Sequence, residues 1–132
     1  MDFHKKLKDK GLKATPQRLL ILTIISEGGH IDIETIYNKI KKIIPSISIA
    51  TIYKNLKLLV EKGIIKEVNI SSFKLLYEVN TTEHIHLICK NCKKIFDMEI
   101  NNTEFKKLLE NNIQNKIDKF EINAFIICKN CL

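Results

Sequence analysis

Two Cys-x-x-Cys pairs constrain this chain more than any other feature of its sequence. All four cysteines of the 132-residue protein fall into them, as Cys89 with Cys92 and as Cys128 with Cys131. Two thiolates at this spacing lie on a tight turn and reach one ion together, and two such turns complete the tetrahedral sulfur shell that suits structural zinc. Zinc bound there would tie the end of the chain to its middle, so its binding energy would be folding energy.

Two other uses of the cysteines compete with zinc. A dithiol oxidoreductase of the thioredoxin type needs one pair at a strand-to-helix turn in a βαβ unit, and no such unit is predicted around either pair. Disulfides need an oxidising compartment. Residues 1–6 lack the apolar core of a secretory signal, and the longest apolar run, residues 19–25, is too short to span a bilayer. We therefore expect a soluble cytoplasmic protein with reduced, zinc-bound cysteines.

The front part of the chain is its basic part. The formal net charge is +7, and residues 1–79 hold 14 lysines and arginines against eight acidic residues, while residues 80–132 hold eight against seven. A basic front half and a nearly neutral, cysteine-clamped back half indicate a nucleic-acid-binding domain over residues 1–79 and a second domain over residues 80–132. A lysine-rich solvated surface is the alternative, and composition does not separate the two.

The front half is expected to be helical first and then stranded. Helices are predicted over residues 2–10, 16–27, 33–44 and 49–62, the last three capped by Thr15, Asp32 and Ser48. The fourth helix has a predicted buried stripe of Ile49, Ile52, Leu56, Leu59 and Val60. Two β-prone runs, residues 64–70 and 74–79, predict a hairpin around residues 71–73. Helices followed by a hairpin are typical of a winged helix-turn-helix domain.

The helix capped by Ser48 is the candidate recognition helix. Its other face carries Ala50, Thr51, Tyr53, Lys54 and Lys57. Threonine and tyrosine can contact a thymine methyl group, and lysine can contact phosphate or guanine, so this face suits the major groove of double-stranded DNA. The alternative is an ordinary core helix with a lysine-bearing solvent face.

The back half predicts a small α+β unit after a polar hinge at residues 80–83. Strands are expected over residues 84–90, 94–97 and 120–127, with a helix capped by Thr103 before the last strand. Because side chains alternate along a strand, His84 and His86 should share one face and Cys89 should point to the other.

Three segments together resemble the ferric-uptake-regulator family of bacterial metal-dependent repressors, including its peroxide-sensing branch. They are Leu12-Lys13-Ala14-Thr15-Pro16-Gln17-Arg18, Ser48-Ile49-Ala50-Thr51-Ile52-Tyr53-Lys54-Asn55-Leu56, and His84-x-His86-x-x-Cys89-x-x-Cys92. The resemblance covers nearly the whole chain. It implies a winged-helix DNA-binding domain, a C-terminal dimerisation domain, and a homodimer that binds a palindromic operator when a regulatory metal is bound.

The resemblance also implies a second, regulatory metal site. Its pattern carries onto His30, Glu78, His84, His86 and Asp97. Mixed imidazole and carboxylate ligands suit Fe²⁺, Mn²⁺ or Zn²⁺, whereas four thiolates suit permanent zinc. One ion shared between the two domains would fix the angle between them. Taken singly, His30 could be a loop residue and Glu78 a solvated strand carboxylate.

For DNA, the resemblance points to Tyr53 and Lys54 in the major groove and to Lys13 in the minor groove or on the backbone. Ser48, Thr51, Lys57 and Arg18 are further candidates.

The chain also departs from the family pattern. Many members of the family have a histidine cluster before the His-x-His motif and another histidine near the last strand, which form a third metal site. This chain has no such cluster at residues 80–83 and no histidine after His86, so two metal sites per chain are predicted. Glu78 stands where peroxide sensors usually have aspartate, whereas Asp97 fits that branch. Lys93 replaces a frequent glycine after the second cysteine.

These observations predict an α+β protein that is not an enzyme. We expect a cytoplasmic, homodimeric, metal-dependent repressor that binds double-stranded DNA, with structural Zn²⁺ and regulatory Fe²⁺ or Mn²⁺, and with neither a membrane nor a small organic substrate as partner. A peroxide-responsive or zinc-responsive regulator of the same family is the alternative. From other classes, a Cys-x-x-Cys oxidoreductase and a structural zinc module that binds RNA or protein compete with it.

Overall fold

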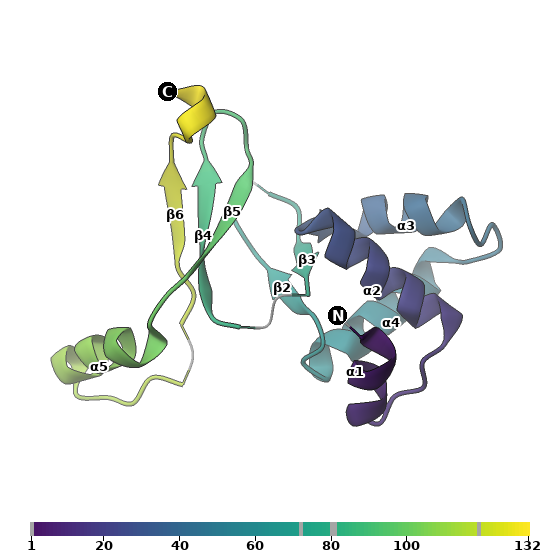
Figure 1. Cartoon of the computed structure of the whole chain (residues 1–132), viewed down its shortest axis with the longest axis horizontal. Coiled ribbons are helices and arrows are strands. Elements are labelled where there is room, and N and C mark those ends of the chain that lie inside the picture. Colours follow the sequence, from purple (N-terminus) through teal and green to yellow (C-terminus); the bar gives the residue numbers. More distant parts are fainter. Residues whose placement is uncertain (1, 72, 80–81, 119) are drawn as a thin grey trace. The chain divides into compact units, whose positions relative to one another are not determined.

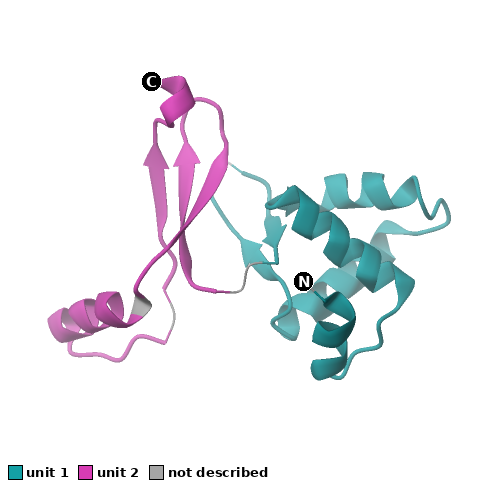
Figure 2. Cartoon of the chain, in the orientation of Figure 1, with its two compact units in different colours: residues 1–81 teal, residues 82–132 magenta. Residues whose placement is uncertain are grey.

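The chain forms two compact units, residues 1–81 and residues 82–132 (Figures 1 and 2). The structure is a computed structural model that describes residues 2–71, 73–79, 82–118 and 120–132. Helices and strands occur in both units, which confirms the expected α+β class. The expected hinge at residues 80–83 lies partly outside the described residues, because Asn80 and Thr81 are not among them. Among the described residues, no helix is both long and apolar enough to cross a membrane.

Unit 1 consists mainly of helices. Its elements are α1 (Phe3–Asp9), α2 (Pro16–Gly28), β1 (Ile31–Asp32), α3 (Ile33–Lys41), α4 (Ile49–Glu61), β2 (Lys66–Val68) and β3 (Leu76–Glu78). The caps of two helices are those expected from the sequence. The Thr15 hydroxyl accepts a hydrogen bond from the Arg18 amide at 3.3 Å, and the Ser48 hydroxyl accepts one from the Thr51 amide at 3.2 Å. These bonds fix where α2 and α4 begin.

Asp32 caps α3 differently from the expectation. It stands at the N-cap position, but its side chain makes no bond to a helix amide. Its carboxylate accepts a hydrogen bond from the Thr35 hydroxyl instead.

The apolar core of unit 1 lies among its helices. Buried side chains come from α2, α3 and α4, namely Ile21, Leu22, Ile25, Ile36, Ile40, Ile52, Leu56 and Leu59. The expected stripe of α4 is wrong at Ile49, which is 41% exposed at the first position of the helix. Asn55, a polar residue, is buried on α4 instead.

A three-stranded antiparallel sheet completes unit 1. Strands β2 and β3 pair with Glu67 opposite Tyr77, as the predicted hairpin requires, although the paired strands are shorter than expected. Ser72, at the predicted turn, lies outside the described residues. The sequence did not predict β1, which pairs with β3 and places Ile31 opposite Tyr77. The order of strands is therefore β1-β3-β2.

Unit 2 is a second three-stranded sheet with one long helix. Its elements are β4 (His84–Cys89), β5 (Ile95–Glu99), α5 (Asn102–Ile113), β6 (Asn123–Ile126) and the short 3₁₀ helix η1 (Lys129–Cys131). The predicted cap of α5 is wrong. Asn101, not Thr103, is the cap residue, and its side-chain oxygen accepts from the Glu104 amide at 3.5 Å.

Strand direction in this sheet explains the long spacing between the cysteine pairs. β4 pairs antiparallel with β5 and parallel with β6, in the order β5-β4-β6. Parallel neighbours need a crossover of a dozen or more residues, and β5 with α5 supplies it. β4 and β6 finish at the same end of the sheet, with Cys89 opposite Ile126. The two cysteine pairs therefore lie together at that end (Figure 1).

Candidate functional site

Four thiols meet at the end of unit 2 where β4 and β6 finish. The sulfur atoms of Cys89, Cys92, Cys128 and Cys131 all lie within 4.8 Å of one another. The Cys92 and Cys128 sulfurs are 3.7 Å apart. Tetrahedral zinc with Zn–S bonds of about 2.3 Å requires sulfurs about 3.8 Å apart, so the cluster has the dimensions of a zinc site. All four cysteines are free thiols. The zinc prediction requires free thiols, whereas the disulfide alternative requires them to be paired.

The protein backbone favours a thiolate at Cys89. The amide of Cys128 donates to the Cys89 sulfur at 3.4 Å. This hydrogen bond, with others from the turn, lowers the pKa of the Cys89 thiol to about 6. The neighbouring Cys128 sulfur raises the pKa of the Cys131 thiol to about 12. A divalent cation would offset about half of the negative charge that the sulfurs carry when all four are deprotonated, which fits resident zinc.

The turn after the first cysteine pair explains why glycine is frequent at the position of Lys93 in the resembling family. Lys93 has φ of +64°, in the left-handed region that favours glycine. Its amide donates to the Cys89 carbonyl at 3.0 Å, and the Cys89 amide donates to the Lys94 carbonyl at 3.0 Å. This chain therefore closes its first cysteine turn with a lysine in a conformation that costs it stability.

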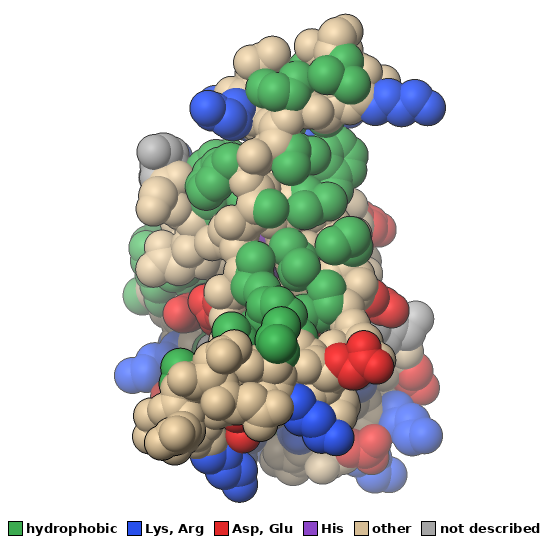
Figure 3. All heavy atoms as spheres, turned by 90° about the vertical axis from the view of Figure 1, so that its left-hand side faces the viewer, with side chains coloured by type: hydrophobic (Ala, Val, Ile, Leu, Met, Phe, Trp, Pro, Cys, Tyr) green, Lys and Arg blue, Asp and Glu red, His purple; other side chains and the backbone are tan. Residues whose placement is uncertain are grey.

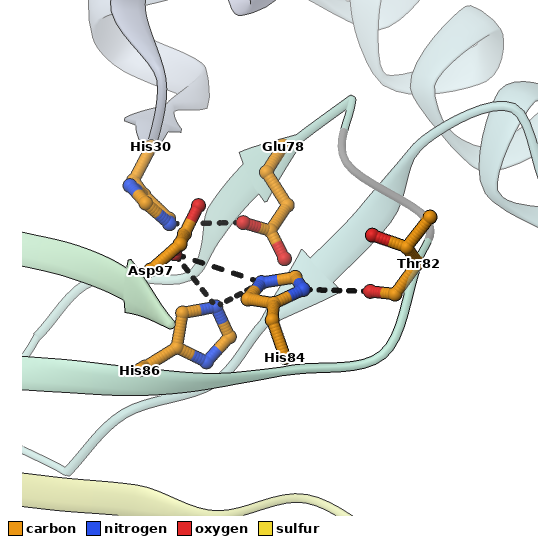
Figure 4. Close-up of polar contacts among 6 residues, drawn as sticks. All are labelled: His30, Glu78, Thr82, His84, His86 and Asp97. Atoms are coloured by element: carbon orange, nitrogen blue, oxygen red, sulfur yellow. Dashed lines mark hydrogen bonds and ion pairs between the residues drawn. The ribbon is translucent and has the colours of Figure 1, made fainter. Parts of the chain in front are cut away.

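A second group of polar side chains lies on β4 and β5 of unit 2. The sheet register places Asp97 opposite His86, with His84 next along the same face. The Nε2 atoms of His84 and His86 are 3.0 Å apart, and each is within 4 Å of Asp97 Oδ1, at 3.6 Å and 3.8 Å (Figure 4). Both histidines are buried. The strand alternation predicted from the sequence is thus present in the structure.

A backbone carbonyl orients the first of these imidazoles. His84 Nδ1 lies 2.6 Å from the Thr82 carbonyl oxygen, which can only accept a hydrogen bond. Nδ1 therefore donates, and in the neutral ring the lone pair is then on Nε2, the atom that faces His86 and Asp97 (Figure 4). A metal-binding histidine usually has its other nitrogen held in this way. No sequence pattern predicts this role of the Thr82 carbonyl.

Unit 1 holds a pair of its own. His30 Nε2 lies 2.9 Å from Glu78 Oε2 (Figure 4), and the Glu78 side chain is only 2% exposed. The pairing of β1 with β3 explains this contact, because Ile31 is opposite Tyr77 and the next position in that register sets His30 beside Glu78. Neither residue is the isolated loop or solvated strand side chain of the alternative interpretation. Within each unit, the predicted regulatory ligands are thus close together.

The residues predicted to contact DNA lie in unit 1, and most of them are exposed to solvent. Tyr53 is 52% exposed. Lys13, Ser48, Lys54 and Lys57 are exposed, and Thr51 is half-buried. Arg18 also lies at this surface, where it lines a pocket of about 270 Å³ together with Lys54 and Lys57. Its guanidinium is hydrogen-bonded within the protein.

The partner of that arginine is not predicted from the sequence. Arg18 Nε donates to Asn55 Oδ1 at 3.1 Å, and Arg18 Nη1 donates to the Lys13 carbonyl at 3.0 Å. A polar residue within the apolar stripe of α4 was the available signal, because a buried amide needs hydrogen-bond partners.

Comparison with known proteins agrees with this arrangement. The model of the ferric uptake regulator family matches residues 9–125. The chain belongs to the ferric uptake regulator family. It is 32% identical over 127 residues to the peroxide-responsive repressor PerR of Staphylococcus aureus (strain Mu50), covering 95% of this chain and 86% of that protein.

Solved structures of the ferric uptake regulator family share the fold. The peroxide stress regulator of Campylobacter jejuni has a TM-score of 0.75 and 39% identity, covering 99% of this chain and all of that one. The ferric uptake regulator of Vibrio cholerae has a TM-score of 0.74 and 27% identity, covering 96% of this chain and all of that one. The chain is accordingly a metal-dependent transcriptional repressor and not an enzyme.

Proposed function

We propose that this protein binds a palindromic operator as a homodimer when Fe²⁺ or Mn²⁺ occupies a regulatory site made of His30, Glu78, His84, His86 and Asp97. Zinc on the four cysteines holds the fold throughout. The observation that carries the regulatory site is the His84–His86 pair on β4, whose Nε2 atoms are 3.0 Å apart with Asp97 on the opposing strand.

That pair has the dimensions of two ligands to one ion. Metal–nitrogen bonds of about 2.0–2.1 Å place two imidazole nitrogens roughly 2.9 to 3.4 Å apart in octahedral or tetrahedral geometry. Imidazole with carboxylate suits Fe²⁺, Mn²⁺ and Zn²⁺ alike, and metal availability in the cell selects among them. The sheet supports the pair before any metal binds, so the histidines lose little freedom on binding.

Regulation follows from how the ligands are divided. His30 and Glu78 belong to unit 1, whereas His84, His86 and Asp97 belong to unit 2. An ion that takes ligands from both units favours the one arrangement of the units that lets all of them reach it. A ligand shifts such an equilibrium by its difference in affinity for the two states. The metal thereby selects the arrangement in which two recognition helices of a dimer match the operator.

A second copy of the chain is the proposed cover for an apolar face of unit 2. The register puts Ile85, Leu87, Phe96, Met98 and Ala124 on one face of the sheet. Phe96 is 40% and Met98 46% exposed, and hydrophobic side chains gather on the side of unit 2 that Figure 3 turns to the viewer. Among the described residues of unit 2, few apolar side chains are buried, namely Ile88, Cys89 and Cys128. Such a unit needs zinc and a partner for stability.

The DNA would be read by α4. Tyr53 and Lys54 on its exposed face would enter the major groove, supported by Ser48, Thr51 and Lys57, with Lys13 contacting the minor groove or the backbone.

A peroxide response is the second candidate. The observation that favours it is the similarity to peroxide-responsive regulators of S. aureus and C. jejuni. Mass spectrometry after exposure of the Fe²⁺-loaded protein to hydrogen peroxide tests it. Addition of oxygen to His30, His84 or His86, with release from DNA, supports this function. An unmodified protein that stays on DNA excludes it.

The regulatory site is tested with two histidine variants. The apparent affinity for operator DNA is measured with and without Mn²⁺ for the wild type, His86→Ala and His4→Ala. His4 is an exposed residue of α1 outside both metal groups, so His4→Ala is the matched control. We expect His86→Ala to remain a folded dimer that no longer responds to metal, while His4→Ala behaves as the wild type. An unchanged metal response in His86→Ala would show that the site is wrongly assigned.

A further inference from the structure

Asn55 is the polar residue on the buried side of the candidate recognition helix. It is 9% exposed, and its buried neighbours on α4 are Ile52, Leu56 and Leu59. A side-chain amide in such a place is costly unless its oxygen and its nitrogen both find partners. The amide therefore calls for an explanation beyond the core.

Both ends of the Asn55 amide are bonded. Its oxygen accepts from Arg18 Nε at 3.1 Å, and its nitrogen donates to the Thr51 carbonyl at 3.0 Å. A guanidinium can only donate and a carbonyl can only accept, so these two partners allow one orientation of the amide. Asn55 thus presents a fixed acceptor to Arg18.

Arg18 extends this link to the segment before α2. Its Nη1 donates to the Lys13 carbonyl at 3.0 Å. The planar guanidinium holds its donors in a rigid fork, so the bonds to Asn55 and Lys13 constrain each other. Through one side chain, the backbone of Lys13, the first turn of α2 and the helix α4 are held together.

This link lies at the cationic surface of unit 1. Arg18 and Asn55 line the pocket of about 270 Å³ that Lys54 and Lys57 also line. Lys13 itself is exposed, so its side chain is available to a ligand while its carbonyl is bonded.

We propose that Arg18 and Asn55 are positioning residues that hold Lys13 in a fixed place relative to the DNA-reading face of α4. This inference rests on the proposed DNA-binding function and refines one of its assignments. Arg18 acts on DNA through Lys13 rather than as a phosphate contact of its own. A segment ordered before binding loses less conformational freedom when DNA arrives, which increases affinity.

A double-mutant cycle on DNA affinity tests the proposal. Operator affinity is measured at fixed salt and metal for the wild type, Lys13→Ala, Asn55→Ala and the double variant. Lys13→Ala should weaken binding of the wild type about tenfold, and should weaken binding of Asn55→Ala by less than about threefold. A general loss of stability would scale all affinities together and leave the cost of Lys13→Ala unchanged.

Asn112→Ala is the matched control. Asn112 in α5 donates from its side-chain nitrogen to the Leu108 carbonyl at 3.0 Å, the same bond to the fourth residue before it that Asn55 makes. It lies in unit 2, where its side chain bonds to the backbone of its own helix. In the Asn112→Ala background, Lys13→Ala should weaken binding to the operator by the same factor of about ten as in the wild type.

Two further variants separate positioning from direct contact with phosphate. Arg18→Lys keeps the charge but removes the fork, and it should lose affinity as much as Arg18→Ala does. Asn55→Ala changes no charge, yet it should lower the slope of log affinity against log salt by about one, because the Lys13 contact is lost. Since Arg18 is only half-buried, Arg18→Lys gives this readout even if Asn55→Ala unfolds.

Several results would overturn the proposal. They are an equal cost of Lys13→Ala in the wild type and in Asn55→Ala, no cost of Lys13→Ala in the wild type, and wild-type affinity in Arg18→Lys. If the wild type does not bind the operator with any metal, the proposed DNA-binding function fails, and this inference fails with it.

Discussion

The backbone conformation of Lys93 destabilises the folded protein. Its φ of +64° is one that a side chain with a Cβ atom adopts at a cost of about 1–2 kcal/mol. We expect Lys93→Gly to raise the free energy of unfolding by about 1 kcal/mol, because glycine adopts this conformation without the clash. Thermal unfolding of the zinc-loaded protein followed by circular dichroism measures the difference.

Lys94→Gly is the matched control for that change. Lys94 is the next residue, is exposed, and is not among the described residues with positive φ. Glycine there should destabilise the protein slightly through the added freedom of the unfolded chain. If both substitutions shifted the melting temperature downward, the strain assigned to Lys93 would be absent.

Residue-scale prediction from sequence succeeded where the local pattern decides the outcome. Ser48 and Thr15 cap their helices because the bond they make spans three residues. Asn55 and Asn101 were missed for different reasons. The role of Asn55 depends on Arg18, which is 37 residues away. Asn101 stands two residues before Thr103, the predicted cap.

The N-cap of α4 gives a prediction at the scale of one element. Ser48→Ala removes the acceptor of the Thr51 amide and should lower stability by about 1 kcal/mol. It should also weaken DNA binding, because the first turn of α4 carries candidate contacts. Ser46→Ala, at an exposed position of the preceding loop, is the control. Equal urea midpoints for the two variants would contradict the role of the cap.

The strand β1 shows why elements are harder to predict than caps. It has two residues, too few for any alternating pattern, and exists because β3 pairs with it. Yet β1 sets His30 beside Glu78, so the sequence identified the pair only through the family pattern. The parallel pairing of β6 with β4 was likewise hidden, since nothing in a strand's own residues states its direction.

Removal of zinc tests the element that this pairing creates. Because β4 and β6 end at the four thiols and unit 2 has few buried apolar residues, Cys92→Ser should lose zinc and then lose the fold of unit 2 and the dimer. Zinc content, size-exclusion chromatography and circular dichroism follow the three consequences. A zinc-free Cys92→Ser protein that stays a folded dimer would limit the cysteines to a minor role.

At the scale of the whole molecule, the proposed dimer is the first requirement for binding a palindromic operator. Phe96→Glu places a charge on the apolar face of the unit 2 sheet, where β5 leaves this side chain 40% exposed. We expect it to yield a zinc-loaded monomer, since burial of an unpaired carboxylate opposes association. Light scattering after chromatography gives the mass. Lys107→Glu, a charge reversal at an exposed position of α5, is the control and should remain dimeric.

We propose that a metal bound by residues of both units controls binding to DNA. The most direct measurement is the affinity for DNA upstream of the protein's own gene, titrated separately with Fe²⁺, Mn²⁺ and Zn²⁺ without oxygen at one salt concentration. We predict that one metal tightens binding by at least about tenfold, a coupling of about 1.4 kcal/mol. Tight binding that no metal changes would leave the zinc cluster in place and remove the sensor.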